Sequence, residues 1–282
     1  MTPQLITQAP LAHLRWDPTA VLGPGPGPVV VLLHGVGGGR QAWDDVAMGP
    51  GQGTGAALAA AGFTALAVDF PGYGLSPLVQ PLDLAAMAGA VAALISHAQA
   101  GPAIVVGHSM GGMVAQELMA TQPQAVAALV LAGTSPAFGK PGGGWQRDFL
   151  QSRFAPLDAG VGMAGLAGPL VAGMVAPGTA PALQARAQAL MAGVPEASYR
   201  TAVSALVAFD RRANLPHIAV PTLVITGEAD RTAAPEVARK MAERIPGAAL
   251  VILPGAGHLL NIEQPAAFNA ALLAFLRGLA RP

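Results

Sequence analysis

Cysteine is absent from the sequence, so the protein can form no disulfide, use no thiolate nucleophile and bind no metal through cysteine. Charged residues are scarce as well, at 11% of the chain, and the 15 basic side chains are balanced by 15 acidic ones. A nucleic-acid-binding protein needs a basic surplus to neutralise phosphates, so we expect no nucleic-acid partner. The 52% share of hydrophobic residues is in turn too high for a disordered chain.

A hydrophobic run that could cross a membrane is also not evident. Residues 159–183 carry no charge and are numerous enough for a spanning helix, but prolines and glycines interrupt them, and no pattern of aromatic, Lys or Arg anchors flanks them. The first 16 residues lack the basic segment and apolar run of a signal peptide. We therefore expect a cytoplasmic protein without a membrane span.

Short apolar runs alternate along the chain with longer segments rich in Ala and Leu. This alternation is typical of an α/β fold in which a mostly parallel, twisted sheet carries helices on both faces. The predicted strands are Val29–Leu33, Thr64–Val68, Ala103–Val106, Ala127–Leu131, Thr222–Thr226 and Ala249–Leu253. The predicted helices lie near Gly53–Ala61, Leu82–Ala98, Met110–Thr121, Pro235–Arg244 and Pro265–Leu279. The residues before Trp16 are expected to add one or two antiparallel edge strands.

The alternation stops near Ser135 and resumes near Val220. The intervening segment has a helical composition and no convincing strand, so we expect a helical cap over residues 136–212, inserted into a core formed by 1–135 and 213–282. Its apolar residues either close over a pocket at the carboxyl edge of the sheet or simply pack on the sheet. These residues are Met163, Leu166, Leu170, Leu190 and Met191.

The strongest chemical motif is a Gly-x-Ser-x-Gly pattern formed by Gly107, Ser109 and Gly111. It directly follows a predicted strand and directly precedes a predicted helix, and only small residues fit around a serine in so tight a turn. Such a turn holds the hydroxyl above the sheet edge. We interpret Ser109 as a nucleophile.

A serine hydroxyl needs a base within hydrogen-bonding reach, and the base needs an acid that holds its tautomer. His258 follows the last predicted strand, and Asp230 follows the strand before it, so both lie at the carboxyl edge, where ligands meet an open α/β sheet. The chain order Ser109, Asp230, His258 is the order that this kind of fold requires. Glu228 is the rival to Asp230, but it lies nearer the strand and is expected to point elsewhere.

Four other polar residues near these loops receive structural interpretations. His34 and His108 flank turns and are expected to be structural. Asp69 is expected to organise the turn that follows its strand, and Glu263 to brace the last helix.

A tetrahedral intermediate needs two N–H donors for its oxyanion. We expect one from Met110, directly after the serine, and the other from Val36, in the glycine-rich loop after the first buried strand. The glycines of that loop do not continue into a dinucleotide fingerprint, because Arg40 stands where the last glycine belongs. We expect no cofactor and no metal.

Taken together, these residues resemble the α/β-hydrolase fold superfamily over essentially the whole chain. The motifs that carry the resemblance are Leu33-His34-Gly35, Asp69-Phe70-Pro71-Gly72-Tyr73-Gly74-Leu75-Ser76, Gly107-His108-Ser109-Met110-Gly111-Gly112, Gly227-Glu228-Ala229-Asp230 and Gly257-His258. Within the superfamily the chain looks most like 3-oxoadipate enol-lactonases and carboxylesterases. The resemblance implies a serine hydrolase of a small-molecule ester or lactone, with Ser109, Asp230 and His258 as its catalytic residues.

Two alternatives remain open at the level of sequence. One is hydrolysis of a carbon–carbon bond in ring-fission products, although the similar enzymes usually carry Asn where His108 stands. The other is a non-catalytic ligand receptor, because a fold does not fix a function.

The cap sequence carries a basic surplus, with seven basic and four acidic residues between 136 and 212. A basic lid would attract carboxylates, and an arginine could hold one through two hydrogen bonds. Trp145, Arg147 and Arg153 are therefore the expected substrate-binding residues. The alternative is that these arginines are solvated surface charges.

Overall fold

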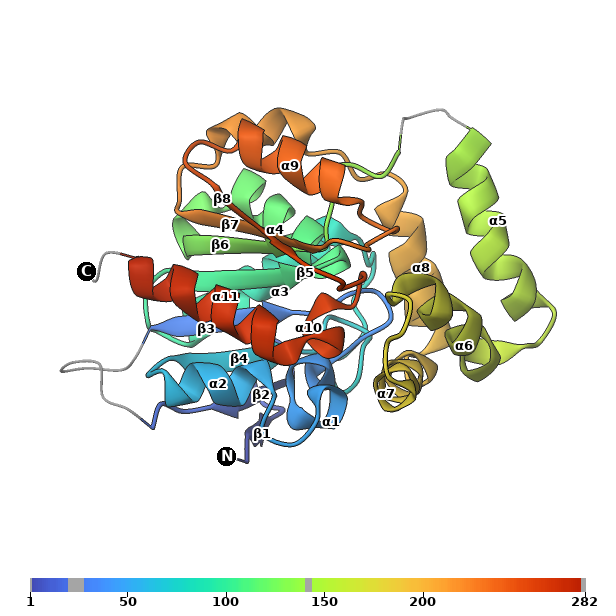
Figure 1. The fold of residues 1–282 in the computed structure, drawn as a ribbon, viewed down its shortest axis with the longest axis horizontal. Helices are drawn as coiled ribbons and strands as arrows, with labels where there is room; N and C mark the ends of the chain where they lie inside the picture. Colours follow the sequence, from blue (N-terminus) through green and yellow to red (C-terminus); the bar gives the residue numbers. More distant parts are fainter. Residues whose placement is uncertain (1, 20–27, 140–143, 280–282) are drawn as a thin grey trace.

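The computed structural model describes residues 2–19, 28–139 and 144–279, which form an eight-stranded sheet covered by helices (Figure 1). The order across the sheet is β1-β2-β4-β3-β5-β6-β7-β8. The first two strands are antiparallel, and β4, β3, β5, β6, β7 and β8 run parallel. The strands are β1 (Gln4–Ile6), β2 (His13–Trp16), β3 (Val29–Leu33), β4 (Thr64–Val68), β5 (Ala103–His108), β6 (Val126–Ala132), β7 (Thr222–Gly227) and β8 (Ala249–Leu253).

Helices cover both faces of the sheet, with α2 and α11 in front and α3 and α4 behind it in Figure 1. The helices of the core are α1 (Asp45–Met48), α2 (Thr54–Ala60), α3 (Leu84–His97), α4 (Met110–Thr121), α9 (Pro235–Arg244), α10 (Leu260–Glu263) and α11 (Pro265–Gly278). Short 3₁₀ helices lie at Arg40–Trp43, Pro123–Ala125 and Arg212–His217. The fold class expected from the alternating pattern is confirmed, as are the antiparallel strands before Trp16.

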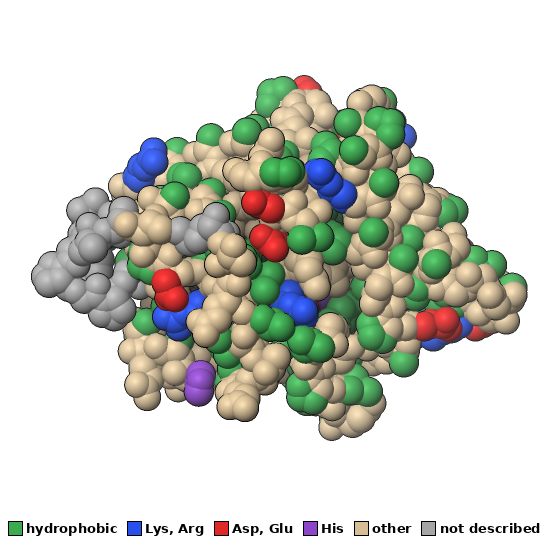
Figure 2. All heavy atoms as spheres, turned by 90° about the horizontal axis from the view of Figure 1, so that it is seen from below, with side chains coloured by type: hydrophobic (Ala, Val, Ile, Leu, Met, Phe, Trp, Pro, Cys, Tyr) green, Lys and Arg blue, Asp and Glu red, His purple; other side chains and the backbone are tan. Residues whose placement is uncertain are grey.

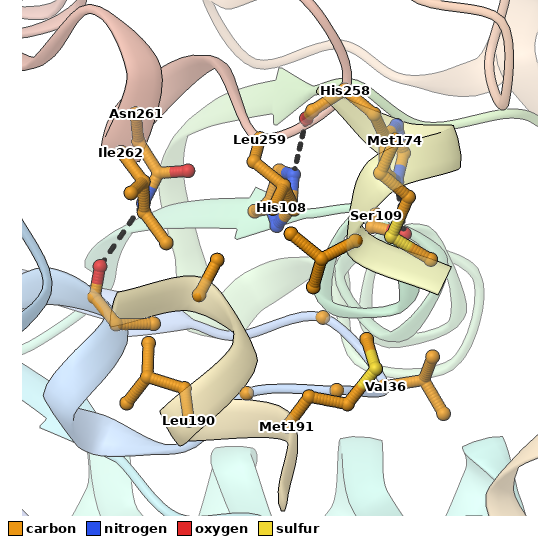
Figure 3. A pocket seen from close by; sticks show the side chains of 16 residues that line it. Val36, His108, Ser109, Met174, Leu190, Met191, His258, Leu259, Asn261 and Ile262 are labelled. Carbon is orange, nitrogen blue, oxygen red and sulfur yellow. Dashed lines mark hydrogen bonds between the residues drawn. The ribbon is translucent and has the colours of Figure 1, made fainter. Parts of the chain in front are cut away.

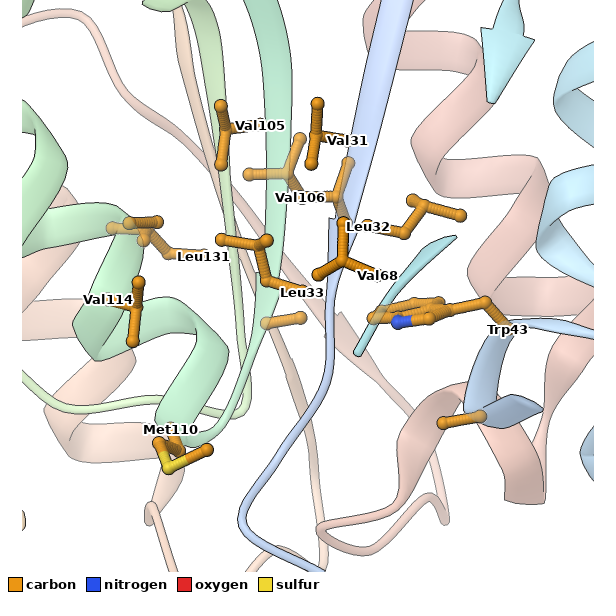
Figure 4. Close-up of a cluster of buried hydrophobic side chains, with 14 of the residues drawn as sticks. Val31, Leu32, Leu33, Trp43, Val68, Val105, Val106, Met110, Val114 and Leu131 are labelled. Atoms are coloured by element: carbon orange, nitrogen blue, oxygen red, sulfur yellow. The ribbon is translucent and has the colours of Figure 1, made fainter. Parts of the chain in front are cut away.

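The central strands owe their position to continuous apolar runs. Every residue of β3, β4 and β5 is buried, as expected for parallel strands covered on both faces. Figure 4 shows Val114 of α4 on one side of these strands and Trp43 on the other. Because each such side chain stabilises the fold by about 1.5–3 kcal/mol when fully buried, this core gives a rigid platform for the loops at the strand ends.

Four helices lie between β6 and β7, at one end of the sheet (Figure 1). They are α5 (Gly144–Asp158), α6 (Gly162–Met174), α7 (Pro181–Ala192) and α8 (Glu196–Leu206). The chain segments entering and leaving this group pair with each other, since Phe138 N–H donates to Phe209 O and Arg211 N–H donates to Pro136 O. Arg211 also pairs with the buried Glu117 of α4 at 2.7 Å. These bonds hold together the two ends of the group where the chain leaves and re-enters the core.

The surface reflects the balanced charge of the sequence. On the face shown in Figure 2, charged side chains are scattered among apolar and backbone atoms and gather into no area of one sign. Among the helices that the structure describes, none has the length and hydropathy needed to span a membrane.

Candidate active site

Ser109 sits in a strained turn between β5 and α4. Its φ of 53° and ψ of −116° place it outside the regions that side-chain-bearing residues normally occupy, at a cost of about 1–3 kcal/mol. The backbone around it is held on both sides: Ser109 N–H donates to Ala132 O at 2.9 Å, and the Thr134 hydroxyl donates to Ser109 O at 2.8 Å. The turn therefore projects the hydroxyl from the end of β5 with little freedom.

The glycines of the motif are required by close backbone approach. A Cβ on Gly107 would meet the carbonyl group of Gly111, and a Cβ on Gly111 would meet the carbonyl group of Leu33. A Cβ on Gly112 would meet the Thr134 side chain. Neither backbone carbonyl can move aside without opening the turn, so the sequence pattern follows from sterics.

We expect Gly107→Ala to lower the free energy of unfolding by about 2 kcal/mol or more, or to prevent folding, because its methyl group overlaps backbone. Gly89→Ala is the matched control, since Gly89 is exposed within α3 and a Cβ there meets nothing within 4 Å. This control should gain up to about 1 kcal/mol from helix propensity. Urea-induced unfolding measures both changes, and equal midpoints for Gly107→Ala and the wild type would contradict the steric account.

Ser109, His258 and Asp230 form one hydrogen-bonded chain. Ser109 Oγ lies 3.0 Å from His258 Nε2, and His258 Nδ1 lies 2.9 Å from Asp230 Oδ2. The His258 and Asp230 side chains are only 3% and 0% exposed. Because the carboxylate can only accept, Nδ1 carries the proton and Nε2 is left free to accept from the serine hydroxyl. The structure thus brings together the three residues expected from the sequence.

The environment keeps Asp230 ionised. Burial raises the pKa of its carboxyl group, but the charge and hydrogen bond of His258 and the N–H groups of Ala233 and Thr232 lower it, and the net effect is a lowered pKa. The two N–H groups donate to Oδ1 at 2.9 and 2.8 Å, which leaves Oδ2 for His258. A fixed negative charge of this kind can stabilise an imidazolium.

Glu228 does not reach His258. Its Oε2 accepts a hydrogen bond from Gly255 N–H at 3.0 Å, in an exposed part of the same loop region. The expectation that it points elsewhere is confirmed.

Glu263 differs from its expected role at the last helix. Its carboxylate accepts from the backbone N–H groups of Gly257 and Leu259 on either side of His258, at 3.1 Å each, and from Ala176 N–H at 2.7 Å. The His258 N–H itself donates to Met174 O, the last residue of α6, at 2.7 Å. Glu263 therefore fixes the histidine loop to the α6–α7 connection. The sequence could not reveal this, because one partner, the Ala176 N–H, belongs to a distant segment.

His34 and His108 are both buried and bonded to backbone. His34 donates from Nδ1 to Gly35 O at 2.7 Å and accepts at Nε2 from Phe70 N–H. His108 Nε2 lies 2.8 Å from His258 O, which can only accept, so it donates there. Burial and the neighbouring His258 ring lower the pKa of His108 to about 4, so this side chain is neutral near pH 7. Asp69 accepts from the N–H groups of Arg40 and Leu75 and so organises its turn, as expected.

The lowered pKa of His108 predicts a loss of stability in acid. An unfolded histidine titrates near pH 6.5, so His108 binds a proton below that pH when the chain is unfolded. In the folded protein His108 binds this proton only near pH 4. His108 alone should therefore remove about 2 kcal/mol of stability between pH 7 and pH 5.

His108→Gln keeps an N–H for His258 O but does not titrate, so its stability should fall less over the same interval. Urea unfolding at pH 7 and pH 5 measures the difference. Burial also lowers the pKa values of His13 and His34, but these residues titrate equally in both proteins. Their contributions to the loss of stability therefore cancel in the comparison. Identical losses in the two proteins would contradict the assignment.

Two backbone N–H groups are available beside the serine. Within the part of the chain that the structure describes, neither Met110 N–H nor Val36 N–H has a hydrogen-bond acceptor. The Tyr73 hydroxyl donates to Val36 O at 3.2 Å, which helps to fix the orientation of that loop. Both groups meet the basic requirement for oxyanion donors, a free N–H on a held backbone.

A small cavity of about 50 Å³ lies next to Ser109 and His258, between the core and the helices α6 and α7 (Figure 3). Its described lining contains no Lys, Arg, Asp or Glu. It is lined by Gly35, Val36, Gly37, Gly38, Ala42, His108, Ser109, Val171, Met174, Ala187, Leu190, Met191, His258, Leu259, Asn261 and Ile262. Of the cap residues expected to face a pocket, Leu190 and Met191 do so, whereas Met163, Leu166 and Leu170 are buried elsewhere. Among the described residues, no cluster of His, Asp or Glu is arranged to hold a metal ion.

The structure does not bring Trp145, Arg147 and Arg153 to this cavity. All three lie on α5, which packs against α6 and α8 on the outer side of the cap (Figure 1). The Arg147 side chain is 83% exposed, and Arg153 stacks on the Phe149 ring, 4.7 Å from its centre. Their role as substrate-binding residues therefore stays a prediction, and their place on α5 does not support it. The sequence could not tell which helices of the cap face the sheet.

The sequence and the fold of the chain are similar to those of known proteins. The model of the alpha/beta hydrolase family matches residues 30–271. The chain is 32% identical to a putative carbamate hydrolase, RutD, of Variovorax paradoxus, over 93% of this chain and 96% of that protein. It is 30% identical to the pimeloyl-[acyl-carrier protein] methyl ester esterase of Neisseria meningitidis, over 88% of this chain and 77% of that protein.

Two further comparisons differ in coverage. The chain is 32% identical to the polyketide synthase ThaQ of Burkholderia thailandensis, but it spans only 12% of that much longer protein. Among solved structures, the enol-lactonase of Burkholderia xenovorans superposes with a TM-score of 0.79 at 26% identity, over 94% of this chain and 97% of that one.

Proposed function

The chain belongs to the alpha/beta hydrolase family and is a hydrolase of ester-like bonds, and from this premise we propose that it cleaves a small carboxylic ester or lactone through an acyl-enzyme intermediate on Ser109. The observation that carries the proposal is the hydrogen-bonded chain from Ser109 Oγ through His258 to Asp230. A hydroxyl, a base and an orienting carboxylate in this order are the requirements for nucleophilic catalysis by serine.

In the first half of the reaction, Ser109 Oγ attacks the carbonyl carbon while His258 Nε2 takes the hydroxyl proton. The electron pair of the carbonyl bond moves to its oxygen, where the N–H groups of Val36 and Met110 stabilise the negative charge. When the carbonyl reforms, the bond to the leaving oxygen breaks and His258 returns the proton to that oxygen. The leaving group is an alcohol from an ester, or the tethered hydroxyl from a lactone.

In the second half, a water molecule replaces the alcohol. His258 takes one proton from water, the hydroxide attacks the acyl carbon, and the bond to Ser109 Oγ breaks as the proton returns to the serine. Asp230 remains ionised throughout and stabilises the imidazolium in both halves. The products are a carboxylic acid and the unchanged enzyme.

The cavity favours a small and largely uncharged substrate. Its volume of about 50 Å³ is far below the roughly 300–1,000 Å³ of pockets that enclose larger ligands. A larger acyl group would enter only if α6 and α7 moved away from the core. The apolar side chains of those helices would then contact the acyl chain.

The proposal is tested by offering the enzyme p-nitrophenyl esters of short acids, methyl esters and simple lactones. We expect turnover of esters and an initial burst of p-nitrophenol equal to the enzyme concentration. A protein that releases no product from any of them, above the level of Ser109→Ala, would overturn the proposal. Binding without product release would favour a ligand receptor instead.

A further inference from the structure

Asn261 presents an unpaired polar atom at the cavity. It lies in α10, three residues after His258, and is only 2% exposed. Its side-chain Nδ2 donates to Ala42 O at 3.0 Å, whereas its Oδ1 is buried and has no hydrogen-bond partner among the described residues. In Figure 3 the amide oxygen of Asn261 points away from its dashed hydrogen bond and toward the other lining side chains.

The orientation of this amide follows from its one partner. The carbonyl oxygen of Ala42 can only accept, so the nitrogen of Asn261 must face it and the oxygen must face the other way. A buried acceptor left without a donor costs about 1–3 kcal/mol. Native proteins leave few such atoms, and each one calls for an explanation.

The position of the atom supplies that explanation. Five other buried side-chain atoms are unpaired among the described residues, and they belong to Trp16, Arg40, Trp43, Gln116 and Arg211. None of these five residues lines the cavity beside Ser109, and Asn261 does. Among the described lining residues, Asn261 is therefore the one that carries an unpaired buried side-chain atom, and this atom is an acceptor on the short segment that also carries His258.

We propose that Asn261 Oδ1 selects substrates that carry a neutral hydrogen-bond donor, an amide N–H or a hydroxyl, near the ester or lactone group. The inference rests on the proposed function, because it places the substrate in the cavity beside Ser109. Most lining side chains of the cavity are apolar, among them Ala187, Leu190 and Ile262, and these offer a donor no partner.

Charged groups fit this position poorly. A carboxylate would turn its lone pairs toward those of Oδ1, and no Lys or Arg among the described lining residues would compensate. An ammonium group would lack an acidic partner in the same lining. The structure thus favours a neutral polar substrate over the acidic one expected from the cap arginines.

The test compares matched methyl esters that differ in one donor. The pairs are 2-hydroxybutanoate with 2-methylbutanoate, 3-hydroxybutanoate with 3-methylbutanoate, and N-acetylglycinate with its N-methyl derivative. We expect the wild type to favour the donor-bearing member of at least one pair by tenfold or more in kcat/KM. Asn261→Leu and Asn261→Ala should reduce this preference to threefold or less while still hydrolysing the donor-free member.

Asn269→Leu is the matched control. Asn269 is also a buried asparagine, but its oxygen accepts from the Thr54 hydroxyl, its nitrogen donates to Gln52 O, and it lies outside the cavity lining. This variant should keep the wild-type preference. If both variants at position 261 fail to fold, competitive inhibition of the wild type tests the inference instead. Butyramide should then inhibit at least tenfold more strongly than N,N-dimethylbutyramide.

The outcomes separate this inference from the proposed function. Three outcomes would overturn the inference about Asn261 and leave the proposed function standing. The first is ester hydrolysis by the wild type with no donor preference in any pair. The others are a preference that survives in both Asn261 variants, and an equal loss of rate in these variants on both members of each pair. Equal inhibition by the two amides would do the same. A wild type that hydrolyses no ester or lactone would overturn the proposed function itself.

Discussion

Replacing Ser109 by alanine is expected to lower kcat for ester hydrolysis by about five to six orders of magnitude, because loss of the nucleophile of such a triad removes most of the acceleration. Among the described residues the hydroxyl has one side-chain partner, His258 Nε2, so its removal breaks a single hydrogen bond there. The unusual backbone of residue 109 is retained by alanine, which has the same Cβ. The fold should therefore survive.

The measurement is kcat with a p-nitrophenyl ester, together with the melting temperature. Ser204→Ala is the control, since Ser204 is exposed on α8 and its hydroxyl donates to Arg200 O of its own helix. It should retain the wild-type rate. A folded Ser109→Ala protein with more than a hundredth of the wild-type rate would exclude Ser109 as the nucleophile.

Asp230→Asn is expected to lower kcat by about four orders of magnitude, through the tautomer of His258. The N–H groups of Thr232 and Ala233 donate to Oδ1, so the amide oxygen of the variant must take that position. Its NH₂ group then faces His258 Nδ1 and donates to it. The ring proton is forced to Nε2, which can no longer accept from Ser109.

Glu228→Gln is the matched control for Asp230→Asn, because it removes a carboxylate of the same loop region that accepts a hydrogen bond from Gly255 N–H. We expect its kcat to change less than threefold. If Glu228→Gln were the more damaging substitution, Glu228 would be the orienting acid. Circular dichroism of both variants checks that the loop changes leave the fold intact.

Much of the fold could be predicted because the strands are recognisable from the pattern of their own residues. β3 and β4 match the predicted ranges residue for residue, since their apolar runs are continuous and bounded by residues that favour turns. The helices α4 and α9 also match, with the serine turn before α4 and Pro235 at the start of α9. The convergence of Ser109, Asp230 and His258 follows from topology, because the carboxyl ends of parallel strands meet at one edge.

The arrangement of the cap could not be predicted in the same way. Its helices have no strand order to place them, so nothing in the sequence distinguishes α5, which lies outside, from α7, which contacts α1 and α10 of the core. The basic surplus of the cap therefore suggested Arg147 and Arg153, whereas the residues that reach the cavity are the apolar Leu190 and Met191. Charge alone does not say which way a side chain faces.

Asn261 was missed for a different reason. Its signal was visible in the sequence, as a polar residue within the otherwise apolar run from Leu259 to Ile262. A polar residue in such a run is either exposed or bonded, and only the three-dimensional structure shows that one of its two polar atoms is bonded to Ala42 O and the other is not. The same holds for Glu263, whose partners are backbone N–H groups and the Thr179 hydroxyl.

The acyl-enzyme on Ser109 is the central claim, and trapping it is the most direct test. The enzyme is mixed with p-nitrophenyl butyrate, quenched with acid within the first turnover, and examined by mass spectrometry of the intact protein and of its peptides. We predict the mass of one added butyryl group, located on Ser109 and missing from Ser109→Ala. A wild type that hydrolyses the ester without this adduct, or that carries it on another residue, would contradict the account.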